Sequence, residues 1–258
     1  MPRAFLSSLV FLAIVAIAFT FSGVDYSWED WHPASCMPDN CFCEAIRDGA
    51  VRQPANTWSS FGFVLVGIWV LNHGSDTSRL LSQKNDSVFD WLYGLAAIAI
   101  GLGSAFYHTS LSFAGQFCDL LGMYLLAVLI LLHHLSRVTP MSDSRLVSIY
   151  FAAILTLSFL LIAAPALRRY LFAALVLTII VIAYRSPSLA HSQQQRRYFT
   201  AAVLALLVAF VCWTVDLTRV LCEPTSWLQG HALWHLLGAL AVGLLHASYR
   251  MPNTSNWA

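Results

Sequence analysis

A serine, a histidine and an aspartate interrupt the otherwise apolar stretch at residues 103–119, which reads GSAFYHTSLSFAGQFCD. Ser104 and His108 are four residues apart, so they lie on one face if a helix continues through them. His231 and His235, in the segment HALWH, repeat this spacing much later in the chain. A histidine pair with this spacing is a common way for one helix to offer two imidazoles to a metal ion, and such a pair needs a third ligand.

We expect the third ligand to be His108. Three histidine nitrogens leave the fourth position of a tetrahedral zinc ion to water, which is the pattern of a catalytic site rather than a structural one. Bound zinc lowers the pKa of that water and makes hydroxide available as a nucleophile. We expect Asp119 to orient the water and carry its proton, and Ser104 to donate a hydrogen bond to the oxyanion that develops on an attacked carbonyl.

The composition is that of a polytopic membrane protein. Of 258 residues, 58% are hydrophobic and 10% are charged, whereas roughly a quarter are charged in an ordinary soluble domain. The formal net charge of +1 indicates neither a basic face for nucleic acid nor an acidic tail. We therefore expect a partner or substrate within the membrane and no nucleic-acid partner, and the composition makes no prediction of oligomeric state.

Apolar runs that suit a crossing of about 30 Å of hydrocarbon recur along the chain. Their approximate bounds are 5–22, 57–72, 88–108, 118–135, 146–163, 170–184, 199–218 and 230–248. The fifth and sixth runs are separated by AAPALRRY, which could instead be a kink within one shorter hairpin. The first run could be a signal peptide or a retained anchor, and we expect retention because no clean A-x-A site precedes Asp25. The predicted fold is all-α, a seven-transmembrane-helix bundle with an additional N-terminal hydrophobic helix.

One bundle accounts for most of the chain, because we find no internal repeat, linker or second domain. The predicted parts are a hydrophobic signal or anchor segment at 1–22, an outer cysteine-containing loop at 23–55, a seven-helix bundle at 56–250 and a short tail at 251–258.

Lysine and arginine residues favour an inward amino terminus, since this orientation places more of them in inner loops than in outer loops. The third helix then ends outward at His108, the fourth begins near Asp119, and the last begins just before His231. All the candidate site residues would therefore share the outer end of the bundle.

Four cysteines fall on the predicted outer side, namely Cys36, Cys41, Cys43 and Cys222. An oxidising outer face favours disulfides, and a bridge between Cys43 and Cys222 would tie the outer loop to the mouth of the bundle. We expect Cys118 and Cys212, which lie in predicted helices, to be free thiols. Such an outer face suits a bacterial inner membrane and an ER or Golgi membrane equally.

Taken together, these residues resemble the alkaline ceramidase family, within a superfamily of membrane hydrolases that also contains the adiponectin and progestin receptors. The matching segments, between residues 43 and 235, are CEAIRDGAVRQPANTWSSFGF, GSAFYHTSLSFAGQFCD and HALWH. The resemblance implies a seven-helix bundle around a lipid-shaped cavity, zinc held by the three histidines, and a disulfide between Cys43 and Cys222. It also implies that Ser104 and Asp119 assist hydrolysis of ceramide to a sphingoid base and a fatty acid.

The outer loop departs from the family pattern. Animal members place an acidic calcium-binding cluster there, with a glutamate in the motif EFWNT, whereas this chain reads QPANT. Gln53 stands where that carboxylate is expected, which argues against a Ca²⁺ site although Glu44 and Asp48 remain. We expect Asn56 to cap or hydrogen-bond at the start of the helix, and Zn²⁺ to be the metal cofactor.

The leading hypothesis is a zinc-dependent membrane amidase that acts on ceramide or a related N-acyl lipid. One alternative is a receptor-like protein of the same superfamily without efficient hydrolysis, because the metal triad alone does not separate the two. Such receptors usually carry a soluble amino-terminal region, and the near absence of one before the first helix favours the enzyme. A transporter would carry polar groups through the midplane and often internal repeats, whereas here the polar groups gather at one end.

Overall fold

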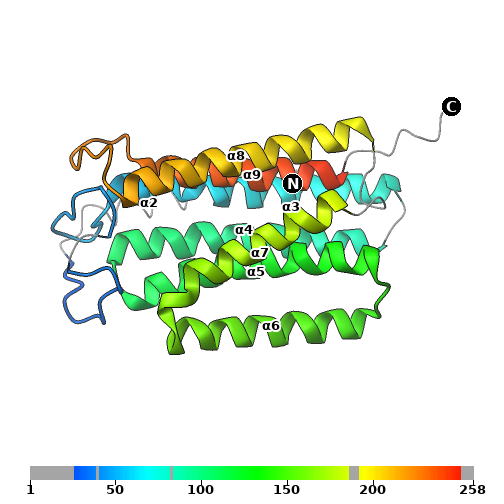
Figure 1. Cartoon of the computed structure of the whole chain (residues 1–258), viewed down its shortest axis with the longest axis horizontal. Coiled ribbons are helices and arrows are strands. Elements are labelled where there is room, and N and C mark those ends of the chain that lie inside the picture. Colours follow the sequence, from blue (N-terminus) through cyan, green and yellow to red (C-terminus); the bar gives the residue numbers. More distant parts are fainter. Residues whose placement is uncertain (1–25, 39–40, 82–83, 186–191, 251–258) are drawn as a thin grey trace, which may run out of the picture.

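The computed structural model describes residues 26–38, 41–81, 84–185 and 192–250, including side chains outside 74–87. Its helices are α2 (Pro54–Ser59), α3 (Phe61–Leu81), α4 (Lys84–Ser110), α5 (Phe113–Val138), α6 (Asp143–Ala163), the 3-10 turn η1 (Pro165–Leu167), α7 (Arg168–Arg185), α8 (Gln193–Leu217) and α9 (Gly230–Arg250). The long helices lie roughly side by side along the molecule (Figure 1). Seven spans within the described residues are long and apolar enough to cross a membrane, which confirms the predicted all-α bundle. The N-terminal helix predicted at 1–22 and the tail at 251–258 lie outside the described residues.

Polar caps, rather than changes in hydropathy, decide where α5 and α8 begin. Helix α5 starts at Phe113, five residues before the apolar run predicted from residue 118. It starts there because the Ser112 hydroxyl accepts a hydrogen bond from the Gly115 amide at 3.1 Å. Similarly, α8 begins directly after Ser192, which forms a capping box with Gln195. The segment AAPALRRY separates two full spans, α6 and α7, with η1 between them, so it is not a kink within one shorter hairpin.

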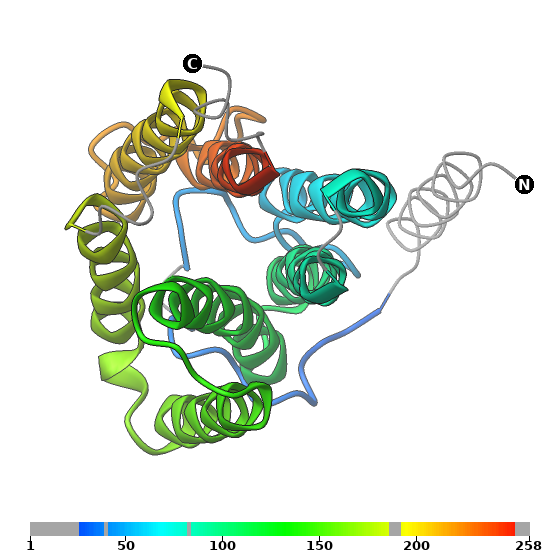
Figure 2. The ribbon, with the colours of Figure 1, turned by 90° about the vertical axis from the view of Figure 1, so that its right-hand side faces the viewer.

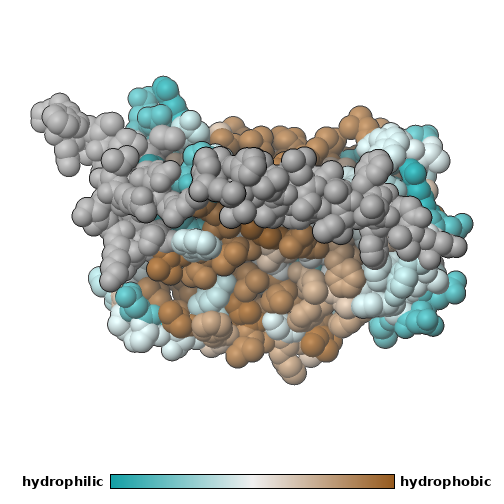
Figure 3. Space-filling model, turned by 180° about the vertical axis from the view of Figure 1, so that it is seen from behind, coloured by the Kyte–Doolittle hydropathy of each residue, from teal (hydrophilic) through white to brown (hydrophobic). Residues whose placement is uncertain are grey.

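The helices α3, α4, α5, α7, α8 and α9 are arranged in a ring, and α6 lies outside it (Figure 2). Helix α4 packs against both α3 and α5, while α9 packs against α3 and α8. Peripheral α6 packs on α5 and leaves Phe151, Leu155 and Phe159 60% to 70% exposed. Apolar side chains fill the middle of the molecule's face, and hydrophilic ones gather at both ends (Figure 3). This distribution is the one that a bilayer requires of the lipid-facing surface.

A close approach between α4 and α5 sets the geometry of one end of the bundle. A Cβ atom at Gly103 would lie 2.6 Å from the Cys118 carbonyl oxygen, so only glycine allows the two backbones to come this near. The turn between the helices is short, and the buried Leu111 adopts a left-handed conformation there, with φ of 48°. As a result, the end of α4 lies directly beside the beginning of α5. We call this the outer end, after the predicted orientation.

Candidate active site

Two disulfides hold the loop that covers the outer end. One joins Cys43 to Cys222, as predicted, and so connects the first loop with the segment before α9. The other joins Cys36 to Cys41, a pairing that the sequence analysis left open. Cys118 and Cys212 are free thiols, also as predicted. The covalent links place the loop over the first turn of α9, where His231 lies.

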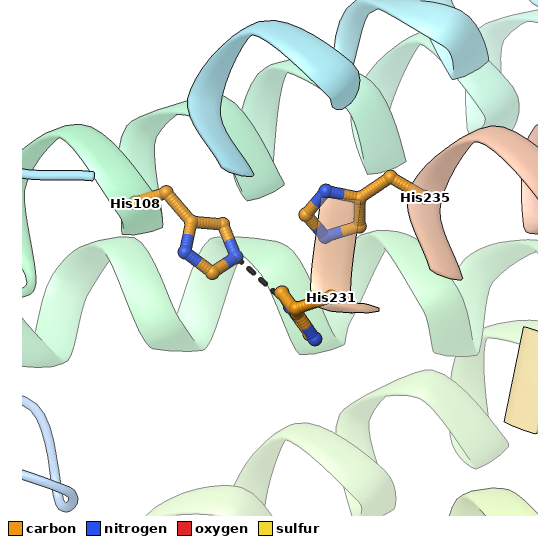
Figure 4. A group of neighbouring side chains, drawn as sticks. All are labelled: His108, His231 and His235. Carbon is orange, nitrogen blue, oxygen red and sulfur yellow. Dashed lines mark hydrogen bonds between the residues drawn. The ribbon is translucent and has the colours of Figure 1, made fainter. Parts of the chain in front are cut away.

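Three buried histidines meet beneath this loop (Figure 4). His108 comes from the last turn of α4, and His231 and His235 come from the first two turns of α9. One nitrogen atom of each lies within 4.8 Å of the others, and the Nε2 atoms of His108 and His231 are 3.1 Å apart. Two ligands at about 2.0–2.1 Å from a tetrahedral zinc ion are roughly 3.3 Å apart, so this spacing fits zinc. The structure thus brings together all three predicted ligands.

Hydrogen bonds on the far side of two rings orient them for this purpose. The Nδ1–H of His108 donates to Oε1 of Gln53 at 2.9 Å, because the Gln53 amide nitrogen is itself committed to the Glu44 carbonyl oxygen at 3.0 Å. His108 Nε2 therefore carries the free lone pair. Nδ1 of His235 lies 2.9 Å from the Ser59 hydroxyl, which leaves its Nε2 toward the other histidines. Such partners are the usual support of metal-binding histidines.

An aromatic contact and a backbone bond position His231. The Phe42 ring stacks on the imidazole with centroids 3.6 Å apart, and the His231 amide donates to the Asp216 carboxylate at 2.9 Å. Its Nδ1 atom is buried and has no partner among the described residues.

Ser104 and Asp119, the two predicted catalytic residues, adjoin the histidines. Ser104 is 1% exposed, and its hydroxyl lies 3.2 Å from Nε2 of His235. Asp119 is half-buried, lies beside Ser104 and lines the same cavity as Ser104 and His235. All five predicted site residues are therefore neighbours, as the shared outer end required. Their chemical roles remain predictions.

Asp216 is a further residue that supports the site, and the sequence analysis missed it. It lies within α8, is 1% exposed, and uses both carboxylate oxygens. One accepts a hydrogen bond from the amide of Cys43 and the other from the amide of His231, each at 2.9 Å. A lone aspartate in an apolar run is itself a signal of function, because a charge within a membrane helix is costly without a specific partner.

Glu44 is one of the two carboxylates that the sequence analysis noted in the loop where family members bind calcium. It is 1% exposed, and its carboxylate accepts hydrogen bonds from the amides of Ala55 at 2.7 Å and Asn56 at 2.9 Å, so it caps α2. Burial raises the pKa of Glu44 above its usual 4.5, although these two hydrogen bonds oppose the rise. The Asn56 side chain itself forms no cap, and its amide is buried without a partner among the described residues.

These contacts do not fit a calcium ion. Calcium needs several free oxygen ligands, whereas both Glu44 oxygens accept hydrogen bonds from backbone amides and Oε1 of Gln53 accepts one from His108. Among the described residues, the only group of three or more histidines, cysteines or carboxylates suited to a metal is the histidine triad.

An elongated cavity of about 520 Å³ extends inward from the triad. Its walls are mostly apolar and are formed chiefly by α5, α7, α8 and α9, with Phe42 at the outer end and Leu245 near the inner end. From His231 to Leu245, at about 1.5 Å per residue of helix, this wall is roughly 21 Å long. Such a cavity can hold an extended hydrocarbon chain with one end at the histidines.

Comparisons with known proteins agree with this geometry. The family model described as Ceramidase matches residues 40–255, which include the last part of the outer loop, α2 to α9 and all five site residues. A Dictyostelium discoideum protein with alkaline ceramidase in its name is 27% identical over 223 residues, covering 72% of this chain and 75% of that protein. Mouse alkaline ceramidase 1 is 25% identical over 234 residues, covering 83% and 82%. Drosophila melanogaster alkaline ceramidase is 22% identical over 218 residues, covering 81% and 75%.

Proposed function

Because this chain belongs to the ceramidase family, we propose that it is a zinc-dependent membrane amidase that hydrolyses ceramide, or a related N-acyl lipid, to a sphingoid base and a fatty acid. Family membership supports ceramide hydrolysis by an integral membrane enzyme, and the zinc ion and the residue roles are our own assignment. The observation that carries this assignment is the buried histidine triad at the outer end of a long apolar cavity.

His108, His231 and His235 would hold the zinc ion, which supplies an activated water when it is bound. Gln53 and Ser59 keep the His108 and His235 rings in position through their Nδ1 atoms. The site therefore needs little rearrangement to bind the ion, since the rings already converge.

Asp119 and Ser104 act on the amide from the cavity wall. The Asp119 carboxylate accepts a proton from the attacking water and passes it to the departing amine nitrogen as the C–N bond breaks. The Ser104 hydroxyl donates a hydrogen bond to the carbonyl oxygen while negative charge develops there. Water thus contributes its oxygen to the fatty acid and its protons to the two products.

The cavity supplies substrate orientation and excludes water. Its apolar walls bind a hydrocarbon chain along the bundle axis, which leaves the amide at the polar outer end. The disulfide-linked loop covers that end, with Phe42 against His231. Hydrolysis is therefore confined to amides whose chains enter the bundle.

The test is release of sphingoid base from ceramide by the purified protein, measured beside its zinc content. We expect His235→Ala to lose both zinc and activity, because it removes one of three ligands. Ser104→Ala should keep the zinc and lose about 10²–10³ in kcat, the usual effect of removing one oxyanion donor. His73→Ala serves as the control, since this exposed histidine lies on α3, far along the bundle from the triad. Normal hydrolysis by the His235→Ala variant would overturn the zinc assignment.

A further inference from the structure

Three charged side chains are among the mostly apolar residues that line the cavity, and only one of the three has a role in the proposed reaction. They are Asp119 on α5 and the adjacent Arg168 and Arg169 at the start of α7. All three are close to the first turns of their helices at the outer end, so they lie on the same side of the cavity's length as the histidines. Arg168 is partly buried and Arg169 is exposed, so both guanidinium groups lie at the mouth of the cavity, where the polar part of a bound lipid would be.

The two arginines have unused binding capacity. Arg168 donates one hydrogen bond, from a guanidinium nitrogen to the Pro165 carbonyl oxygen at 3.0 Å. The Arg169 guanidinium lies 5.5 Å from the centre of the Trp213 ring. Neither has a carboxylate partner in the part of the chain that the structure describes. A guanidinium offers five N–H donors in a planar fork that matches phosphate and carboxylate oxygens, so most of these donors are available.

The backbone of this corner is well supported. The Tyr124 hydroxyl donates to the Arg168 carbonyl oxygen at 3.0 Å, which fixes the start of α7 against α5. The contact between Arg169 and Trp213 joins α7 to α8, two helices that have little other packing with each other among the described residues. The arginines therefore form part of the cavity wall. Under the predicted orientation they also lie on the outer side, where the positive-inside tendency disfavours arginine.

Substrate chemistry indicates what these guanidinium groups bind. In an N-acyl sphingoid lipid, the amide nitrogen and the head-group oxygen are carried by adjacent carbon atoms. When the amide is at the histidines and a hydrocarbon chain is in the cavity, the head group lies at the outer mouth of the cavity. There it faces either Arg168 and Arg169 at the start of α7 or the disulfide-linked outer loop. We propose that Arg168 and Arg169 form a subsite for an anionic head group, so that the enzyme prefers a phosphorylated ceramide to neutral ceramide. This inference rests on the proposed amidase function.

The experiment compares ceramide 1-phosphate with ceramide of the same acyl chain, each in neutral detergent micelles. For the wild-type protein we expect kcat/KM to be about tenfold or more higher for the phosphorylated lipid, as a charge-assisted bidentate contact would give. In the Arg168→Gln/Arg169→Gln variant this preference should disappear. The matched control is Arg145→Gln/Arg185→Gln, which removes two positive charges from exposed positions at the other end of the bundle and should leave the preference intact.

A binding measurement without turnover separates recognition from catalysis. Protein treated with a zinc chelator is titrated with labelled ceramide 1-phosphate, and the double Gln variant should bind about tenfold more weakly than wild type. Phosphatidylglycerol is the competitor, because it presents a phosphate without an N-acyl sphingoid chain. Competition at equal concentration would overturn the proposal, since the arginines would then bind any membrane phosphate. Failure to compete supports a subsite for the substrate's own head group.

The outcomes distinguish this subsite from the amidase function itself. Hydrolysis of ceramide without preference for the phosphorylated lipid overturns the subsite and leaves the amidase function in place. A zinc-loaded protein that hydrolyses neither lipid overturns the amidase function, on which the subsite depends.

Discussion

Replacement of Asp216 tests how the outer loop and the metal site are held together. Its carboxylate accepts hydrogen bonds from the amides of Cys43 in the loop and His231 in α9, each at 2.9 Å. A hydrogen bond to a charged group contributes about 1.5–3 kcal/mol, so Asp216→Ala should lower the free energy of unfolding by about 3–6 kcal/mol. Asp216→Asn keeps one acceptor oxygen and should cost about half as much.

The assay is unfolding of the purified protein in mixed micelles with increasing sodium dodecyl sulfate. Glu223→Gln is the matched control, because this exposed carboxylate accepts a hydrogen bond only from the Thr225 hydroxyl in the described part of the chain. It should unfold like the wild-type protein. Zinc affinity provides a second measurement, since loss of the bond to the His231 amide loosens the first turn of α9, and we expect about 10–100-fold weaker binding.

One result would refute this reasoning. If Asp216→Ala unfolds within about 0.5 kcal/mol of the wild-type protein, the range of an ordinary surface substitution, the two amides find other partners and the carboxylate does not join the segments. The disulfide between Cys43 and Cys222 would then be sufficient to hold the loop.

Three further predictions concern residues around the bundle. Gln53→Leu removes the Nδ1 partner of His108 and should weaken zinc binding by about 10–100-fold in a chelator competition. Gln53→Glu keeps an acceptor oxygen and should retain most of the zinc affinity. Equal zinc affinity of the Gln53→Leu variant and the wild-type protein would contradict this. Because burial raises the pKa of Glu44, the folded protein binds this proton more tightly than the unfolded chain does, so the free energy of unfolding should fall as pH rises from about 4.5 through the raised pKa. Glu44→Gln should lack this part of the pH dependence, and an unchanged slope would exclude Glu44 as its source. Asp90 pairs at the other end of the bundle with His246, at 2.7 Å, and with Arg250. Asp90→Ala should lower the free energy of unfolding by about 3–5 kcal/mol while turnover per zinc-loaded molecule is retained, and a cost as small as that of the exposed Asp143→Ala would contradict the pairing.

The sequence by itself determined the helical architecture and which candidate site residues come together. The thickness of a bilayer requires each span to be a long apolar run, so the runs are visible without any knowledge of packing. Helical periodicity then places Ser104 with His108, and His231 with His235, on shared faces. The alternating direction of successive spans brings both pairs to the outer end. These arguments need only the local sequence and the membrane.

The tertiary structure alone decided the partners that support this site. Gln53 contacts His108 across 55 residues of sequence, and Asp216 contacts Cys43 across 173. In the sequence, Gln53 was read only as a missing calcium ligand and Asp216 as part of an apolar run. A buried polar group needs its hydrogen bonds satisfied in three dimensions, and no local pattern records which distant backbone or side chain supplies them.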